Sequence, residues 1–165
     1  MITEPKLEDR NAQHYVGIRS QVTMQELPAA MDQLGEVFAW LESKGGVPTG
    51  APFIRYLVID MEAKLEIDVA VPVANALTGE GRLIADTLPA GRYVTLLYTG
   101  DYSNLIGVVA ELLAWAENKG LVFDKWSAGP RGEGWRARVE TYLTNPAEEP
   151  DPEKWQTELA FLLAV

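Results

Sequence analysis

The chain has 165 residues, of which 47% are hydrophobic and 23% charged, a composition typical of a globular domain and not of a disordered chain. Its formal net charge of −10 argues against nucleic acid and anionic membranes as partners, because both need a basic surface, and is compatible with cationic ligands. The absence of cysteine and the single histidine exclude disulfides, thiolate catalysis and multi-histidine metal sites.

The N-terminal segment 1–13 is polar and lacks the apolar stretch of a signal peptide. No run of about 18 apolar residues is present to cross a membrane. We therefore expect a cytoplasmic protein. No nucleotide, phosphate or metal motif occurs, so the sequence predicts no cofactor.

The first half of the chain predicts a strand, a helix and two further strands. Thr23 is a good N-cap, and Glu26 completes a capping box three residues later. A lysine and two glycines at 44–46 end the helical pattern. The expected elements are a strand at 15–22, the helix from Thr23 to 44–46, and strands at 53–60 and 64–71 with a turn at 61–63. A further short strand is expected at 82–88, between the two halves.

The second half repeats this pattern. Asp101 or Ser103 is a suitable N-cap for its helix, and Gly120 a suitable residue to follow the helix end. The expected elements are a strand at 92–99, a helix at 102–119, a connector rich in Gly and Trp at 123–134, a strand at 135–143, an acidic Pro-rich loop at 145–152 and a final strand at 155–163. The Gly-rich part of the connector, 129–134, is expected to be a flexible flap.

Two similar halves, about 14–73 and 91–164, can be aligned. Their helices share Ala, Trp, Glu, Lys and Gly at matching places in 38–45 and 113–120. Such a repeat predicts a single domain over 1–165 of the α+β class, built from duplicated β-α-β-β units with pseudo-twofold symmetry. We expect one curved antiparallel sheet with both helices on its convex side. The uncovered concave side is then the expected ligand cleft.

The strand at 135–143 carries the most informative side chains. Its strict alternation places Glu140 and Tyr142 on one face of the sheet. A glutamate held among aromatic rings is either a receptor for cations or a general acid or base with a raised pKa. The alternative is an ordinary strand whose polar face is solvated.

Three motifs in this order resemble one family: YVGIR in the first strand, GRYVTLLYTGDYSNL leading into the second helix, and RVETYLTNP before the Pro-rich loop. Over about residues 14–164 the chain resembles the GyrI-like small-molecule-binding domain, the drug-sensing module of some bacterial multidrug-responsive regulators. The resemblance implies that Glu140 lies at the floor of the cleft, between aromatic rings, and meets the charge of lipophilic cations. Residues 1–13 are too few for a DNA-binding helix-turn-helix, so we expect a stand-alone member.

The resemblance implies binding of lipophilic, aromatic and cationic drugs or dyes, for sensing, sequestration or resistance. An alternative is hydrolysis of cyclopropanoid DNA-alkylating natural products, with Glu140 and Tyr142 as the catalytic residues. A weaker alternative is a protein partner such as DNA gyrase or a regulator. The same aromatic cleft serves binding and hydrolysis, so the sequence does not separate them.

Further residues are candidates for the cleft on the basis of their strands and ring types. For the tryptophans, packing in a core and lining the cleft remain open, and Glu66 with Asp68 also fits a solvated face. Arg136 and Arg138 are alternative partners that would neutralise Glu140. The expected ligand-binding residues are Glu140, Tyr142, Trp126, Trp135, Tyr56, Glu66 and Tyr93.

Overall fold

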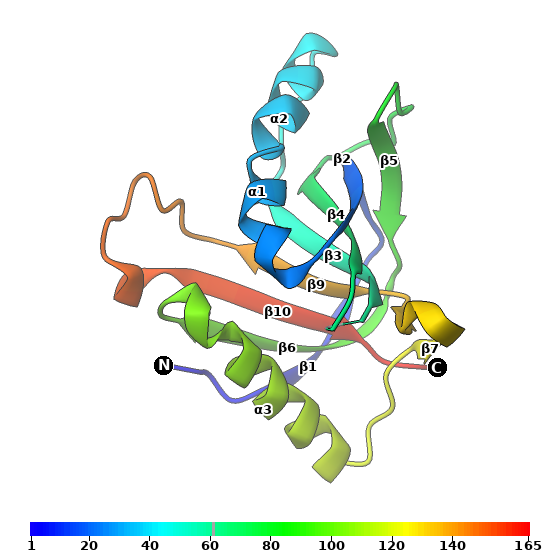
Figure 1. The fold of residues 1–165 in the computed structure, drawn as a ribbon, viewed down its shortest axis with the longest axis vertical. Helices are drawn as coiled ribbons and strands as arrows, with labels where there is room; N and C mark the ends of the chain where they lie inside the picture. The colour runs from blue at the N-terminus through cyan, green and yellow to red at the C-terminus, as the bar shows by residue number, and fades with distance from the viewer. Residues whose placement is uncertain (61) are drawn as a thin grey trace.

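The computed structural model describes residues 1–60 and 62–165, so Met61 in the predicted turn at 61–63 lies outside the described residues. It confirms an α+β fold with a curved antiparallel sheet and two main helical segments (Figure 1). The strands are β1 (Lys6–Arg10), β2 (Gln13–Val22), β3 (Phe53–Ile59), β4 (Leu65–Pro72), β5 (Leu83–Leu88), β6 (Gly91–Thr99), β7 (Lys125–Ser127), β8 (Glu133–Trp135), β9 (Arg138–Tyr142) and β10 (Gln156–Leu162). The α-helices are α1 (Leu27–Met31), α2 (Leu34–Ser43) and α3 (Leu105–Asn118), and the 3₁₀ turns are η1 (Met24–Glu26), η2 (Tyr102–Asn104), η3 (Gly129–Arg131) and η4 (Pro152–Lys154).

Each half of the chain contributes three neighbouring strands to the sheet, in equivalent order from the outside toward the centre. The order is β1-β6-β10-β9-β3-β4-β2-β5, so the second half contributes β6-β10-β9 and the first half contributes β3-β4-β2. The halves meet where β3 pairs with β9, with Ile54 opposite Glu140. The strand that carries Glu140 is therefore central, and both of its neighbours are strands.

The first predicted helix is divided into η1, α1 and α2. Thr23 and Glu26 form the predicted capping box at its start, because each side chain bonds the backbone N–H of the other residue. The division lets Leu27 and Met31 of α1 pack on the centre of the sheet. Val37 and Leu41 of α2 pack on β2 and the edge strand β5. In the second half, Asp101 accepts a hydrogen bond from the Ser103 N–H, as predicted, at the start of η2.

Two segments outside the predicted strands contribute short strands. The charged lead-in 1–13 includes β1, which pairs with β6. The connector 123–134, whose Gly-rich part 129–134 was expected as a flexible flap, contributes most of the β7–β8 hairpin. β8 pairs with the end of β3, at Val58 and Ile59. Short strands such as these give too few alternating residues to be read from the sequence.

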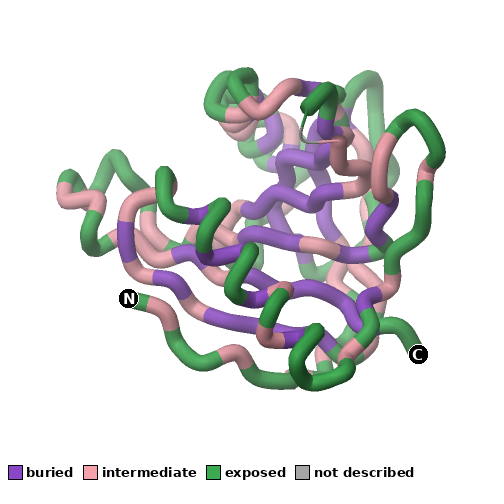
Figure 2. Tube along the Cα trace, turned by 60° about the horizontal axis from the view of Figure 1, so that its bottom comes forward, coloured by how far each residue is buried: buried purple, intermediate pink, exposed green. Residues whose placement is uncertain are grey.

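The helices and the Glu140 side chain share one face of the sheet, which corrects the predicted arrangement. Leu159, the cross-strand neighbour of Glu140 on β10, belongs to the apolar cluster that packs against α3. Val139 instead points to the opposite face, against Tyr15, Phe53 and Ala70. Both faces of the central strands are thus buried (Figure 2). Alternation alone cannot tell such faces apart, so the sequence placed the cleft with Glu140 on the face opposite the helices.

The two helical segments pack over different parts of the sheet face that carries Glu140. Figure 1 shows α1 and α2 on one side and α3 on the other, with β3, β9 and β10 visible between them. Residues of α1, α3, β3 and β9 line one pocket, so the cleft lies on the face that the helices share. The sequence had predicted it on the helix-free face. Among the described residues, no helix is long and apolar enough to cross a membrane.

Candidate functional site

A cavity of about 980 Å³ lies over the central strands, between the two helical segments. Its floor comes from β3 and β9, its walls from η1–α1 and η2–α3, and one end from the loop that follows β9. This volume suits an organic ligand of drug size. The lining is largely apolar, and its side chains include Met24, Leu27, Met31, Ile54, Ile106 and Val109.

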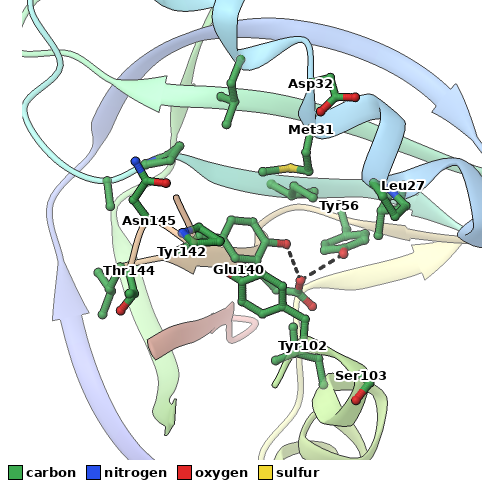
Figure 3. A pocket seen from close by; sticks show the side chains of 18 of the residues that line it. Leu27, Met31, Asp32, Tyr56, Tyr102, Ser103, Glu140, Tyr142, Thr144 and Asn145 are labelled. Carbon is green, nitrogen blue, oxygen red and sulfur yellow. Dashed lines mark hydrogen bonds between the residues drawn. The ribbon is translucent and has the colours of Figure 1, made fainter. Parts of the chain in front are cut away.

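Glu140 is the carboxylate at the floor of this cavity, and only 6% of its surface is exposed. Its Oε2 accepts hydrogen bonds from the hydroxyl groups of Tyr142, at 2.8 Å, and Tyr56, at 3.1 Å (Figure 3). Among the described residues, none donates a hydrogen bond to the other oxygen, Oε1. The carboxyl group is therefore held in place on one side only and retains an acceptor for a ligand.

The electrostatics of the floor follow from this burial. Loss of solvent raises the pKa of Glu140, and this effect exceeds the opposing effects of the Tyr142 hydrogen bond, the Arg138 charge and the Tyr56 hydrogen bond. Burial, together with the neighbouring carboxyl group, raises the pKa values of Tyr142 and Tyr56 well above the ordinary value. Both phenols consequently remain protonated and act as donors.

Aromatic rings continue from the floor toward the second helix. The Tyr102 ring, at the start of η2, meets Tyr142 edge to face with the centroids 5.6 Å apart. It also packs on Trp155 at 4.7 Å. Figure 3 shows Tyr102 and Tyr142 beside the Glu140 carboxylate. At the cavity rim, the exposed side chains of Asp32 and Glu148 add two further carboxylates.

The structure brings three of the predicted site residues together and separates the other four. Glu140, Tyr142 and Tyr56 line the cavity. The side chains of Trp126, Trp135, Glu66 and Tyr93 do not.

The two tryptophans of the connector have different surroundings. Trp135 is 1% exposed and packs with Phe123 and Phe161 in the core beneath α3. Trp126, on β7, is 52% exposed and covers Gly134 of the neighbouring strand, where a Cβ would lie 2.4 Å from the indole. The hairpin formed by β7 and β8 thus takes both rings away from the cavity.

Glu66 and Tyr93 lie away from the cavity for reasons of register. Glu66 alternates with the helix-facing residues of β4 and forms an ion pair with Arg131, with 2.6 Å between Oε2 and Nη2. Tyr93 points to the face opposite α3, and its hydroxyl donates to the Pro89 carbonyl at 2.7 Å. Asp68, also considered on the sequence, is fully buried on this opposite face and bonds Tyr15 and Arg19.

The apolar cavity walls were missed because their residues lie on helices that were expected to pack only on the sheet. The available signal was an apolar residue on each helix beyond those that pack on the sheet: Phe38 of α2 and Ile106 of α3 line the cavity and stay exposed. Ile106 of α3 is 63% exposed, for example. Within the described part of the chain, no group of three or more His, Cys, Asp or Glu side chains is placed to hold a metal ion.

A comparison with protein-family models matches residues 3–164 to the GyrI-like small molecule binding domain. The chain belongs to the GyrI-like family. No curated protein matches it. The family and the cavity agree on a small-molecule-binding domain.

Solved structures with the same fold include domains of different roles. The EcmrR C-terminal domain is 17% identical with a TM-score of 0.71, and the match covers 98% of this GyrI-like chain and 97% of that domain. In the EcmrR–DNA complex the identity is 18% and the TM-score 0.76, with 97% of this chain matched to 57% of that one. This chain therefore spans little more than half of that EcmrR chain.

Two further neighbours bear on ligands and chemistry. SAV2435, solved bound to tetraphenylphosphonium, is 13% identical with a TM-score of 0.65, and the match covers 98% of this chain and 94% of that one. A Listeria innocua protein described as a hydrolase is 16% identical with a TM-score of 0.66, and the match covers 98% of this chain and 92% of that one. At these identities the comparison shows a common fold.

Proposed function

We propose that this GyrI-like domain binds lipophilic aromatic cations in the cavity, with Glu140 as the counter-charge. The observation that carries the proposal is the buried Glu140 carboxylate, whose Oε2 is held by two phenols while Oε1 has no donor among the described residues. A desolvated carboxylate gains strongly from a cation, because no water competes for its charge.

The surroundings of Glu140 support a cationic aromatic ligand. Tyr102 and Tyr142 offer ring surfaces beside the carboxylate, and each cation–π contact contributes about 0.5–2 kcal/mol. Asp32 and Glu148 make the rim negative, which favours the approach of cations. The neighbour solved with tetraphenylphosphonium is an example of such a ligand on this fold. Binding of this kind would serve sensing, sequestration or resistance.

The test compares two ligands of the same shape and opposite charge. Isothermal titration calorimetry with tetraphenylphosphonium and tetraphenylborate should show binding of the cation and much weaker binding of the anion. Glu140→Gln should weaken cation binding roughly tenfold to 100-fold, the loss expected for one charge-assisted interaction. Glu66→Gln is the matched control, since Glu66 lies outside the cavity, and it should change nothing. Equal binding of tetraphenylphosphonium by the parent and Glu140→Gln would refute the role of Glu140.

The pairing of Glu140 with Tyr142 also supports a second candidate, hydrolysis of activated cyclopropanes. The Tyr142 hydroxyl would hydrogen-bond a carbonyl conjugated to the ring, while Glu140 takes a proton from the attacking water. The water oxygen bonds a ring carbon as the strained C–C bond breaks. The electron pair of that bond moves to the carbonyl oxygen, which then takes up a proton from Glu140 or solvent, so the product gains one water. The neighbour described as a hydrolase is consistent with this chemistry on the fold.

Mass spectrometry of a cyclopropanoid alkylating compound incubated with the protein tests this second candidate. The product should be heavier by one water, and Glu140→Gln and Tyr142→Phe should each abolish its formation. Tyr93→Phe, a matched phenol removal on the opposite face of the sheet, should leave the rate unchanged. Turnover that survives both cavity substitutions would exclude this mechanism.

A further inference from the structure

A positively charged residue, Arg138, also lines the cavity, and the cation-binding role does not use it. It precedes Glu140 by two residues on β9 and therefore faces the same side of the sheet. Its guanidinium carbon lies 4.8 Å from the centroid of the Phe161 ring and 4.9 Å from that of Trp135. The Tyr56 ring is 5.7 Å away. The positive charge is thus stabilised by aromatic faces.

Within the described part of the chain, the Arg138 guanidinium has no ion-pair partner, and its buried Nε has no hydrogen-bond partner. The nearby carboxylates do not supply one. Glu133 accepts from Trp135 Nε1 at 2.8 Å through one oxygen and pairs with Lys125 at 3.0 Å through the other. Glu140 attracts Arg138 through space, yet its Oε2 is already bonded by the two tyrosines.

This arrangement is unusual for arginine, which is seldom buried without an anionic partner. Ring faces interact with the plane of a guanidinium, but its N–H groups lie at the edge and need acceptors. A buried donor without an acceptor costs free energy, and in a cavity wall a ligand can supply the acceptor. The guanidinium edge matches the two oxygens of a carboxylate.

We propose that the natural ligand carries a carboxylate beside its cationic aromatic group, so that Arg138 binds the anion while Glu140 binds the cation. The inference rests on the proposed function of the cavity and specifies its ligand class as zwitterionic aromatic compounds. Residues two apart on a strand are separated by roughly 7 Å, which sets the spacing of the two ligand charges. Arg138 then selects against cations that lack the acid.

The experiment compares (3-carboxypropyl)triphenylphosphonium, a zwitterion at neutral pH, with its methyl ester, a cation of nearly the same shape. Calorimetry should show that the parent protein binds the acid more tightly than the ester. Arg138→Met keeps the aliphatic length without the charge, and it should weaken acid binding roughly tenfold or more. Ester binding should be retained or strengthened, because a repulsive charge has been removed. Arg138→Lys should keep part of the preference for the acid.

The outcomes separate this inference from the proposed function. If the parent binds the ester at least as tightly as the acid, the assignment of Arg138 to a ligand carboxylate is wrong, although cation binding stands. Equal losses for both compounds in a folded Arg138→Met would make the residue structural and overturn the inference. If the parent binds neither compound, nor tetraphenylphosphonium, the proposed function itself fails. The parent preference is measurable even if Arg138→Met does not fold.

Discussion

Tyr56 of β3 donates a hydrogen bond of 3.1 Å to Glu140 of β9, and so joins the two halves of the chain at the floor of the cavity. The two residues are 84 positions apart in the sequence. Their contact depends on the pairing of the central strands, one from each half. The ligand site and the junction between the halves therefore share the same residues, and changes at one are expected to affect the other.

Tyr56→Phe should destabilise the protein by about 1–3 kcal/mol, because it removes a buried hydrogen bond to a carboxyl group. The loss should be smaller in a Glu140→Gln background, where the acceptor carries no charge. Urea denaturation of both single variants and the double variant measures this coupling. Tyr93→Phe, which removes a hydrogen bond on the opposite face, should be additive with Glu140→Gln. Additivity of Tyr56→Phe with Glu140→Gln would contradict the expected coupling.

Glu140→Gln should stabilise the unliganded protein at neutral pH. Burial raises the pKa of Glu140 above its ordinary value of 4.5, so the folded state favours the neutral carboxyl group. Below pH 4.5 the Glu140 carboxyl group is protonated in both the folded and the unfolded state. As the pH rises through the pKa of the folded state, the contribution of this neutral group to the free energy of unfolding is lost. Each unit of raised pKa corresponds to about 1.4 kcal/mol. Glutamine removes this dependence and can still accept from both tyrosines.

Thermal unfolding across this pH range measures the effect. The difference in melting temperature between Glu140→Gln and the parent should increase from acidic to neutral pH. Glu66→Gln, at a carboxylate that is ion-paired outside the cavity, is the control and should show no such increase. A parent that becomes steadily more stable than Glu140→Gln toward neutral pH would show that the carboxylate is stabilising, against the expected sign.

The fold was predictable because its signals are local and repeated. The capping box at Thr23 and the alternation of β9 are each readable over a few residues, and the duplication then indicates how the elements assemble. The side of the sheet that faces the helices was not predictable in this way. Val139 and Glu140 point to opposite faces, and both are buried. The alternation of β9 therefore does not indicate which of its two faces meets the helices.

The candidate site was predictable only where its residues lie close together in the sequence. Glu140 and Tyr142 share a strand face, so their proximity follows from the period of two. Tyr56 reaches them only through the register of β3 against β9, which involves distant parts of the chain. The positions of Trp126 and Trp135 depend on a hairpin of three-residue strands, which leaves almost no periodic signal in the sequence.

Thr23→Ala should weaken ligand binding as well as stability. The capping box begins the segment that places Met24 and Leu27 in the cavity wall, and loss of an N-cap costs about 1 kcal/mol. Calorimetry with tetraphenylphosphonium should show lower affinity, alongside a lower melting temperature. Ser43→Ala, which removes a side-chain hydrogen bond at the far end of α2, should leave affinity unchanged. Unaltered affinity in Thr23→Ala would show that the wall does not depend on its cap.

Binding of tetraphenylphosphonium should weaken as pH falls through the raised pKa of Glu140, in a window that lies above 4.5. The ligand carries a permanent charge, so the titrating group belongs to the protein. Affinity should be constant where Glu140 is ionised and should fall about tenfold per pH unit below its pKa, since protonation competes with the cation. Calorimetry across this range gives the midpoint.

Three variants identify the titrating group. Glu140→Gln should show weak binding with little pH dependence in this window, whereas Asp32→Asn, at the exposed rim, should keep the midpoint of the parent. Tyr142→Phe removes a hydrogen bond that lowers the pKa of Glu140, so its midpoint should move to higher pH. A midpoint that follows Asp32 instead would place the counter-charge at the cavity mouth, where water screens it. The ligand would then be held mainly by the apolar walls.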